Sequence, residues 1–173
     1  MKKNNLLWLD LEMTGLDPMR DRIIEFGAIV TDWDFNELAS EEAVVKQSPA
    51  SLKRMDAWNQ KQHKSSGLID KVPKGITEAA AESLLLKLVD TYFDQPVILA
   101  GNSIHQDRAF IRRYWPTLES KLHYRMLDVS AWKVVMMNKY GVGFKKPDAH
   151  RALSDIRGSI EELKYYLSQP KTG

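Results

Sequence analysis

The chain has 173 residues, 43% of them hydrophobic and 28% charged, values typical of a globular protein. We therefore expect a single domain over residues 1–173, long enough to bury a sizeable core. A net charge of +2 is compatible with a polyanionic substrate, but it falls short of the basic surface that holds long duplexes.

Cysteine is absent, which excludes disulfides, thiolate zinc sites and cysteine nucleophiles. A cysteine-free chain fits a reducing compartment, and we expect it in the cytoplasm. No apolar run is long enough to span a bilayer, and only four apolar residues precede Asp10, so neither a membrane segment nor a signal peptide is expected.

The segment from Leu6 to Gly15 combines an apolar run with two carboxylates. Side chains of a strand alternate between its faces, so one face carries Leu7, Leu9 and Leu11, and the other carries Trp8, Asp10 and Glu12. Two acids on one face of a buried strand repel each other, and a divalent cation would compensate them. The alternative is that both acids lie at the solvent-exposed end of an edge strand.

A loop over residues 14–22 leads to a buried strand at 23–33, in which Gly27 allows a close backbone approach, and to a more polar strand at 37–47. Short links make these three strands an antiparallel meander. A polar helical segment follows at 51–67, and the residues KVPKG end it.

The second half of the chain alternates helices and strands. Thr77 caps a helix, residues 96–103 form a short strand, and the next helix stops before Pro116. A fifth strand at 122–127 precedes a helix that Asp128 caps and Gly141 closes, and a last helix follows. The expected fold is α/β, a mixed five-stranded sheet flanked by helices, with the first strand in the middle and the later strands parallel to it.

Two further acids fall near this middle strand. Asp107 follows the fourth strand, and Asp155 lies one turn into the last helix. Taken singly, Asp107 is better explained as a helix-start charge and Asp155 as a solvated helical acid. Together with Asp10 and Glu12 they would repel one another unless metals bind, and two ions roughly 4 Å apart would suit in-line phosphoryl displacement. On a continuous helix His150, five residues before Asp155, would point about 140° away from it. If His150 lies instead in the loop that enters the helix, it could take a proton from a metal-bound water.

Three stretches carry a resemblance to a known family. LDLEMTGLDP, GNSIHQDRAFI and HRALSDIRGSI match, in order and spacing, the motifs of the DEDDh 3′-to-5′ exonuclease superfamily. Within it the chain resembles the oligoribonuclease family from end to end, including MDAWNQKQHKSSGL and HYRMLDVS. The resemblance implies a ribonuclease-H-like fold and two divalent cations, Mg²⁺ or Mn²⁺, with His150 as general base and as ligands Asp10, Glu12, Asp107 and Asp155. Departures lie in KVVMMNKYGVG, which carries none of these acids.

The resemblance also implies the substrate, a very short single-stranded RNA down to the dinucleotide. Leu16 would wedge between bases, with Trp58 and His63 near the terminal nucleotide; without the family, Leu16 reads as a loop residue and Trp58 as core packing. The 5′ phosphate would be held by Ser103, Arg125, Ser130 and Lys133, and Tyr124 would close the site from the partner chain of a homodimer.

Two other functions remain as alternatives. One is a DNA proofreading-type 3′-to-5′ exonuclease of the same superfamily. The other is a nucleotide-sensing module without catalysis, which four retained acids and His150 disfavour because a mere binder gains nothing from self-repelling carboxylates.

Overall fold

The computed structural model describes residues 4–145 and 151–169. Five strands form one sheet in the order β3-β2-β1-β4-β5. They are β1 (Leu6–Met13), β2 (Ile23–Thr31), β3 (Glu37–Val44), β4 (Val97–Gly101) and β5 (Leu122–Asp128). The middle strand β1 pairs antiparallel with β2 and parallel with β4, and β5 is parallel to β4. The predicted mixed sheet, with β1 at its centre, is confirmed.

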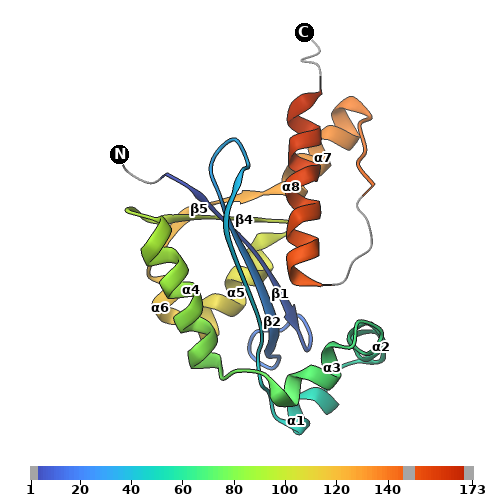
Figure 1. Ribbon diagram of the computed structural model, residues 1–173. Helices are drawn as coiled ribbons and strands as arrows, with labels where there is room; N and C mark the ends of the chain where they lie inside the picture. The colour runs from blue at the N-terminus through green and yellow to red at the C-terminus, as the bar shows by residue number, and fades with distance from the viewer. Residues whose placement is uncertain (1–3, 146–150, 170–173) are drawn as a thin grey trace.

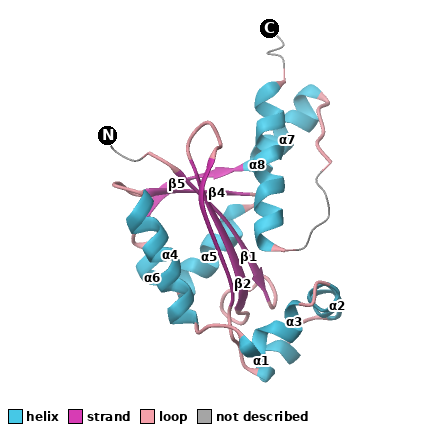
Figure 2. Ribbon diagram, in the orientation of Figure 1, coloured by secondary structure: helices cyan, strands magenta, loops and turns pink. Residues whose placement is uncertain are grey.

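Helices cover both faces of this sheet (Figures 1 and 2). One face packs against α4 (Glu78–Tyr92), α5 (Ile104–Tyr114) and α6 (Pro116–Glu119), and the other against α7 (Val129–Tyr140) and α8 (Ala152–Ser168). The alternation of β1 sets this division, because Leu7, Leu9 and Leu11 belong to the first core and Trp8 to the second. None of the helices in the described ranges has the length and apolar character needed to cross a membrane.

The polar segment at 51–67 is not one helix, as the sequence predicted, but two. The structure has α1 (Pro49–Lys53) and α2 (Ala57–Ser65), followed by α3 (Leu68–Lys71) and the 3₁₀ turn η1 (Val72–Lys74). Asp56 makes the break, because its carboxylate accepts a hydrogen bond from the backbone N–H of Asn59 at 2.7 Å and caps α2. These short helices lie at the end of the β1–β2 hairpin (Figure 1).

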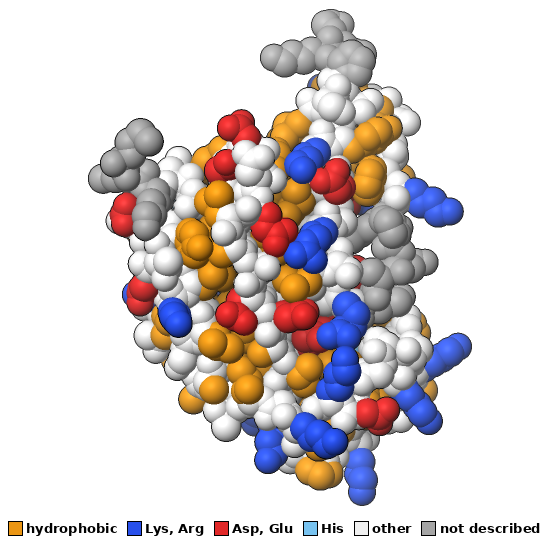
Figure 3. Space-filling model, in the orientation of Figure 1, with side chains coloured by type: hydrophobic (Ala, Val, Ile, Leu, Met, Phe, Trp, Pro, Cys, Tyr) orange, Lys and Arg blue, Asp and Glu red, His pale blue; other side chains and the backbone are white. Residues whose placement is uncertain are grey.

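The polar strand β3 forms one edge of the sheet, a position that its polar composition suits. Acidic side chains are scattered along the middle of the molecular face where this strand runs (Figure 3). Glu37, the first residue of β3, pairs with Arg157 of α8 at 3.0 Å. Charges on an edge strand oppose its pairing with the sheet of another molecule.

Gly27 of β2 fixes how closely the last helix approaches the sheet. A Cβ atom at this position would stand 2.8 Å from the Cβ of Ala152, the first residue of α8. The close approach that the sequence predicted is confirmed, and it brings the first turn of α8 against the acids of β1. We expect any larger residue at position 27 to push this helix away from the site.

Candidate active site

Three carboxylates converge where β1 meets the first turn of α8. Oxygens of Asp10, Glu12 and Asp155 all lie within 4.8 Å of one another. β1 supplies the first two on the face opposite its core leucines, and α8 supplies the third because Gly27 admits its N-terminal turn. The three acids that the sequence analysis placed together are therefore neighbours.

Asp107 reaches the same strand from the first turn of α5. Its Oδ1 accepts a hydrogen bond from the backbone N–H of Leu11 at 2.9 Å, and its side chain is buried. Burial, and next the charge of Asp10, raise the pKa of Asp107 well above its usual value. This acid lies beside the cluster, although its oxygens stand outside the group of three.

The electrostatics of the cluster suit a bound cation. Burial raises the pKa of Glu12 to about 8, and the charges of Asp10, Asp155 and Glu25 add to the shift while Arg151 opposes it. A carboxyl group with so high a pKa lacks sufficient positive charge nearby. Carboxylate oxygens grouped this closely are the donor set that hard divalent cations prefer, so the residues fit such an ion.

Glu25 and Arg151 are a part of the site that the sequence analysis missed. Glu25 faces Glu12 across the β1–β2 pairing and is only 1% exposed. Arg151 binds its carboxylate at 2.8 Å and immediately precedes α8. A glutamate inside the apolar run IIEFGAIV was the available signal, because a buried charge needs a partner.

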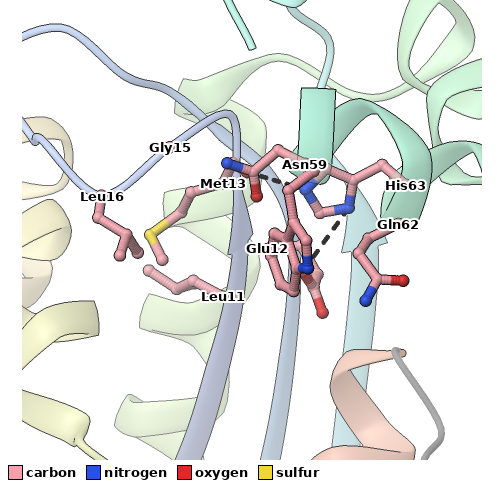
Figure 4. Close-up of a pocket in the computed structure, with 9 residues that line it drawn as sticks. Leu11, Glu12, Met13, Gly15, Leu16, Asn59, Gln62 and His63 are labelled. Carbon is pink, nitrogen blue, oxygen red and sulfur yellow. Dashed lines mark hydrogen bonds and ion pairs between the residues drawn. The ribbon is translucent and has the colours of Figure 1, made fainter. Parts of the chain in front are cut away.

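A pocket of about 150 Å³ opens next to Glu12 (Figure 4). The loop after β1 and the helix α2 line it with Leu16, Trp58, Gln62 and His63 among others. Leu16 and Trp58 are 70% and 65% exposed, so the interpretation of Trp58 as core packing is wrong. Both side chains offer apolar surface to a ligand.

His63 is a buried residue of this pocket. Its Nε2 lies 2.9 Å from the backbone carbonyl of Met13, and its Nδ1 lies 3.8 Å from a carboxylate oxygen of Glu12 (Figure 4). The carbonyl can only accept a hydrogen bond, so Nε2–H donates it. Nδ1, which carries no proton in this tautomer of the neutral ring, then faces the carboxyl group of Glu12. His63 therefore joins α2 to the end of β1.

Ser103 and Ser130 come together at the other side of Asp107. Their hydroxyl oxygens are 3.1 Å apart, and the backbone N–H of Ser103 donates to Ser130 and to Asp128. Ser103 has a φ of 48°, a left-handed conformation that turns its hydroxyl toward α7. Lys133 is exposed one turn further along α7.

Tyr124 and Arg125 lie on the edge strand β5. The guanidinium carbon of Arg125 stands 4.9 Å from the ring centre of Tyr124, and this ring is 71% exposed. His150, the predicted base, lies outside the described residues. Its neighbour Arg151 lies within them and is anchored to Glu25.

Comparisons with known proteins agree with this geometry. The family model described as RNase_T, Exonuclease, matches residues 7–163. An oligoribonuclease of Chromobacterium violaceum is 47% identical over 169 residues, which cover 94% of this chain and 93% of that protein. An oligoribonuclease of Nitrosomonas europaea is 48% identical over 169 residues, with the same coverage.

Solved structures share the fold at much lower identity. Exonuclease I of E. coli, in complex with a dT13 oligonucleotide, superimposes with a TM-score of 0.73 at 18% identity and covers 95% of this chain. A product-bound exonuclease I gives a TM-score of 0.72 at 17% identity. This chain spans about two fifths of the length of those proteins, with 41% and 43% covered.

Proposed function

This chain belongs to the oligoribonuclease family of 3′-to-5′ exoribonucleases, and from that membership we propose that it hydrolyses very short oligoribonucleotides, dinucleotides above all, to nucleoside 5′-monophosphates. The observation that carries the proposal is the direct contact between pocket and acid cluster. Glu12 belongs to both, so a nucleotide held in the pocket has its phosphodiester beside the carboxylates.

The acid cluster indicates divalent metal binding, and we propose two ions, Mg²⁺ or Mn²⁺. Asp10, Glu12 and Asp155 would hold them with Asp107. Bound there, such cations would stabilise negative charge on the phosphodiester oxygens and lower the pKa of the attacking water. His150 is the proposed base that takes the proton from this water.

The pocket and the serine pair supply the proposed contacts with RNA. Leu16 would separate the two bases, and Trp58 and His63 would hold the terminal nucleotide, since these three line one pocket. The 5′ phosphate would be held at a set distance from the acids by Ser103, Arg125, Ser130 and Lys133. Base stacking on exposed apolar and aromatic side chains tolerates any sequence, so no strong base preference is expected.

We expect the rate to be highest for dinucleotides and to fall steeply as the RNA grows, because contacts at both ends of the substrate fix its length. Removing the 5′ phosphate should weaken binding sharply, since Arg125 loses a charge-assisted partner. The measurement is kcat/KM for a 5′-phosphorylated dinucleotide, its dephosphorylated form and an RNA several times longer. Equal values for the dinucleotide and the longer RNA contradict the proposal.

The same assay separates the proposed function from a proofreading-type DNA exonuclease. Matched ribo- and deoxyribo-dinucleotides differ only in the 2′-hydroxyl, which is the group that distinguishes RNA from DNA. Faster turnover of the deoxyribo-dinucleotide, together with high activity on long DNA, would favour the alternative.

We propose that two copies form a homodimer in which Tyr124 reaches the partner's site. Helix α7, which follows β5 directly, exposes an unusual number of large apolar side chains, namely Trp132, Val134, Val135, Met137 and Tyr140. Such a surface is typical of a contact between proteins, and a two-fold dimer would cover it twice. Tyr124 is exposed on the adjoining strand.

Mixing two inactive variants, Asp107→Asn and Tyr124→Ala, tests this arrangement. A mixed dimer then contains one site with an intact Asp107 from one chain and an intact Tyr124 from the other. Random 1:1 mixing makes about half of the dimers mixed, so on the order of a quarter of all sites should recover. Unfolding, remixing and refolding without recovery of activity would show that Tyr124 serves its own chain or no site at all.

The proposed location is the cytoplasm, a reducing compartment that a chain without cysteine fits.

A further inference from the structure

The residues on either side of Asp107 bind parts of the molecule far from one another. Gln106, Asp107 and Arg108 are consecutive residues near the N-terminus of α5. Consecutive residues of a helix point about 100° apart, so these three side chains leave the helix in three directions. Asp107 reaches β1, Gln106 reaches the loop that carries Leu16, and Arg108 reaches the strand that carries Tyr124.

Arg108 holds an irregular stretch of β5. From Val97 to Leu99 the strand β4 advances two residues, while its partner β5 advances four, from Leu122 to Met126. The two extra residues form a bulge, which takes backbone carbonyls out of the regular ladder. The guanidinium of Arg108 donates to two of these carbonyls, those of His123 at 2.8 Å and Tyr124 at 3.3 Å.

The rest of the Arg108 guanidinium is fixed as well. Its Nε and Nη2 donate to the carboxylate of Glu119 at 3.1–3.2 Å, and the whole residue is only 8% exposed. A buried, bidentate pair of this kind allows little movement. The bulge is therefore held against α5 at the point where it turns Tyr124 outward and places Arg125 beside it.

Gln106 holds the opposite end of the site. Its side-chain amide donates to the backbone carbonyl of Leu16 at 2.6 Å, across 90 residues of sequence. The Leu16 side chain itself is 70% exposed, so its position depends on contacts of the backbone of its loop. The amide of Gln106 is one such contact, and it comes from the residue next to Asp107, the acid beside the cluster.

We propose that Gln106 and Arg108 are positioning residues, which hold Leu16 and the Tyr124–Arg125 bulge at fixed distances from Asp107 and so set the length of RNA that the site accepts. The proposal rests on the function proposed above for Leu16, Tyr124 and Arg125. It assigns a role to two residues of the GNSIHQDRAFI stretch that neither bind the metal nor take part in proton transfer.

The variant for the bulge is Arg108→Lys, which keeps the charge but loses the planar fork that spans Glu119 and two carbonyls. Its matched control is Arg112→Lys, one turn further along α5, since Arg112 pairs with the same Glu119 carboxylate from an exposed position. Glu119→Gln is a second variant that leaves the arginine in place, in case Arg108→Lys does not fold.

Activity is measured with a 5′-phosphorylated dinucleotide, its dephosphorylated form and bis(p-nitrophenyl) phosphate, which has neither base nor terminal phosphate. With Arg108→Lys we expect the preference for the 5′-phosphorylated dinucleotide to shrink by about tenfold, mostly through KM, as expected for a misplaced charged contact. Hydrolysis of the aryl diester should stay within about twofold of wild type, because the acids are untouched. Glu119→Gln should change the preference in the same direction, and Arg112→Lys should leave it unaltered.

The variant for the loop is Gln106→Met, of similar size but without a donor. We expect kcat/KM for the dinucleotide to fall about tenfold, the loss expected for one well-formed hydrogen bond, with little change for the aryl diester. The control is Gln95→Met, which removes another long-range side-chain hydrogen bond, to Asn4, away from the site.

The outcomes separate the two proposals. A wild-type protein without any preference for the 5′-phosphorylated dinucleotide tells against the proposed function. The positioning roles alone are overturned if Arg108→Lys and Glu119→Gln keep the wild-type preference and Gln106→Met keeps the wild-type kcat/KM for the dinucleotide. Equal losses of activity on the dinucleotide and on the aryl diester also overturn the positioning roles, since such losses would mark a general structural effect.

Discussion

Asp10→Asn or Asp155→Asn is expected to remove nearly all turnover of a dinucleotide while the protein stays folded. Each change takes one negative charge from a group of oxygens that lie within 4.8 Å of one another, and the remaining carboxylates attract a divalent cation less strongly. Glu12→Gln and Asp107→Asn should do the same. The matched control is Asp90→Asn, an exposed acid of α4 that pairs with Lys121 far from the cluster.

Activity is measured in Mg²⁺ and again in Mn²⁺, with circular dichroism as the check on folding. Near-normal rates in two or more of the four variants would show that these carboxylates do not hold the metal.

Without metal, the same substitutions that remove activity should stabilise the folded protein. The pKa of Glu12 is raised from 4.5 to about 8 in the folded chain, so the folded state binds the proton more tightly than the unfolded state. The resulting stability is fully present below pH 4.5 and is lost as the pH rises through about 8. In EDTA we therefore expect Tm to fall over this range, and Glu12→Gln to flatten the decline. Parallel Tm curves for wild type and variant would mean that burial and the neighbouring carboxylates do not raise the pKa of Glu12.

The middle strand shows how much of the fold the sequence predicts. Leucines at every second position, interrupted by acids on the other face, place β1 between two cores with Asp10 and Glu12 on one side. Short links then predict the meander, and the crossover rule predicts parallel β4 and β5, as the structure has them. Gly27 was recognisable too, because a glycine inside an apolar strand marks a close approach.

The structural features that the sequence does not predict depend on contacts between residues far apart in the chain. Glu25 and Arg151 are 126 positions apart, and Gln106 and Leu16 are 90 apart, so no local pattern joins either pair. The bulge of β5 depends in the same way on Arg108, and a regular strand was the natural expectation for LHYRML. The break at Asp56 is different, since an aspartate that caps a helix through the backbone N–H three residues further on is a local signal, present in the sequence itself.

His150→Ala is expected to lower the rate by about 10²- to 10⁴-fold, the usual contribution of a general base, without loss of metal binding. The residue itself lies outside the described part of the chain, but the next one along, Arg151, is anchored to the buried carboxylate of Glu25 at 2.8 Å. Asp155 stands in the first turn of α8, which begins directly after Arg151.

Two measurements identify the role of His150. Residual activity of the alanine variant should rise with pH, because hydroxide replaces the water that the base would have deprotonated. Titration calorimetry with Mn²⁺ should give the same affinity as for the wild type, since a base that does not ligate the ion leaves its donor set of carboxylates intact. A variant that loses the calorimetric signal together with its activity would make His150 a ligand, and the base would then have to be sought among the other groups of the site.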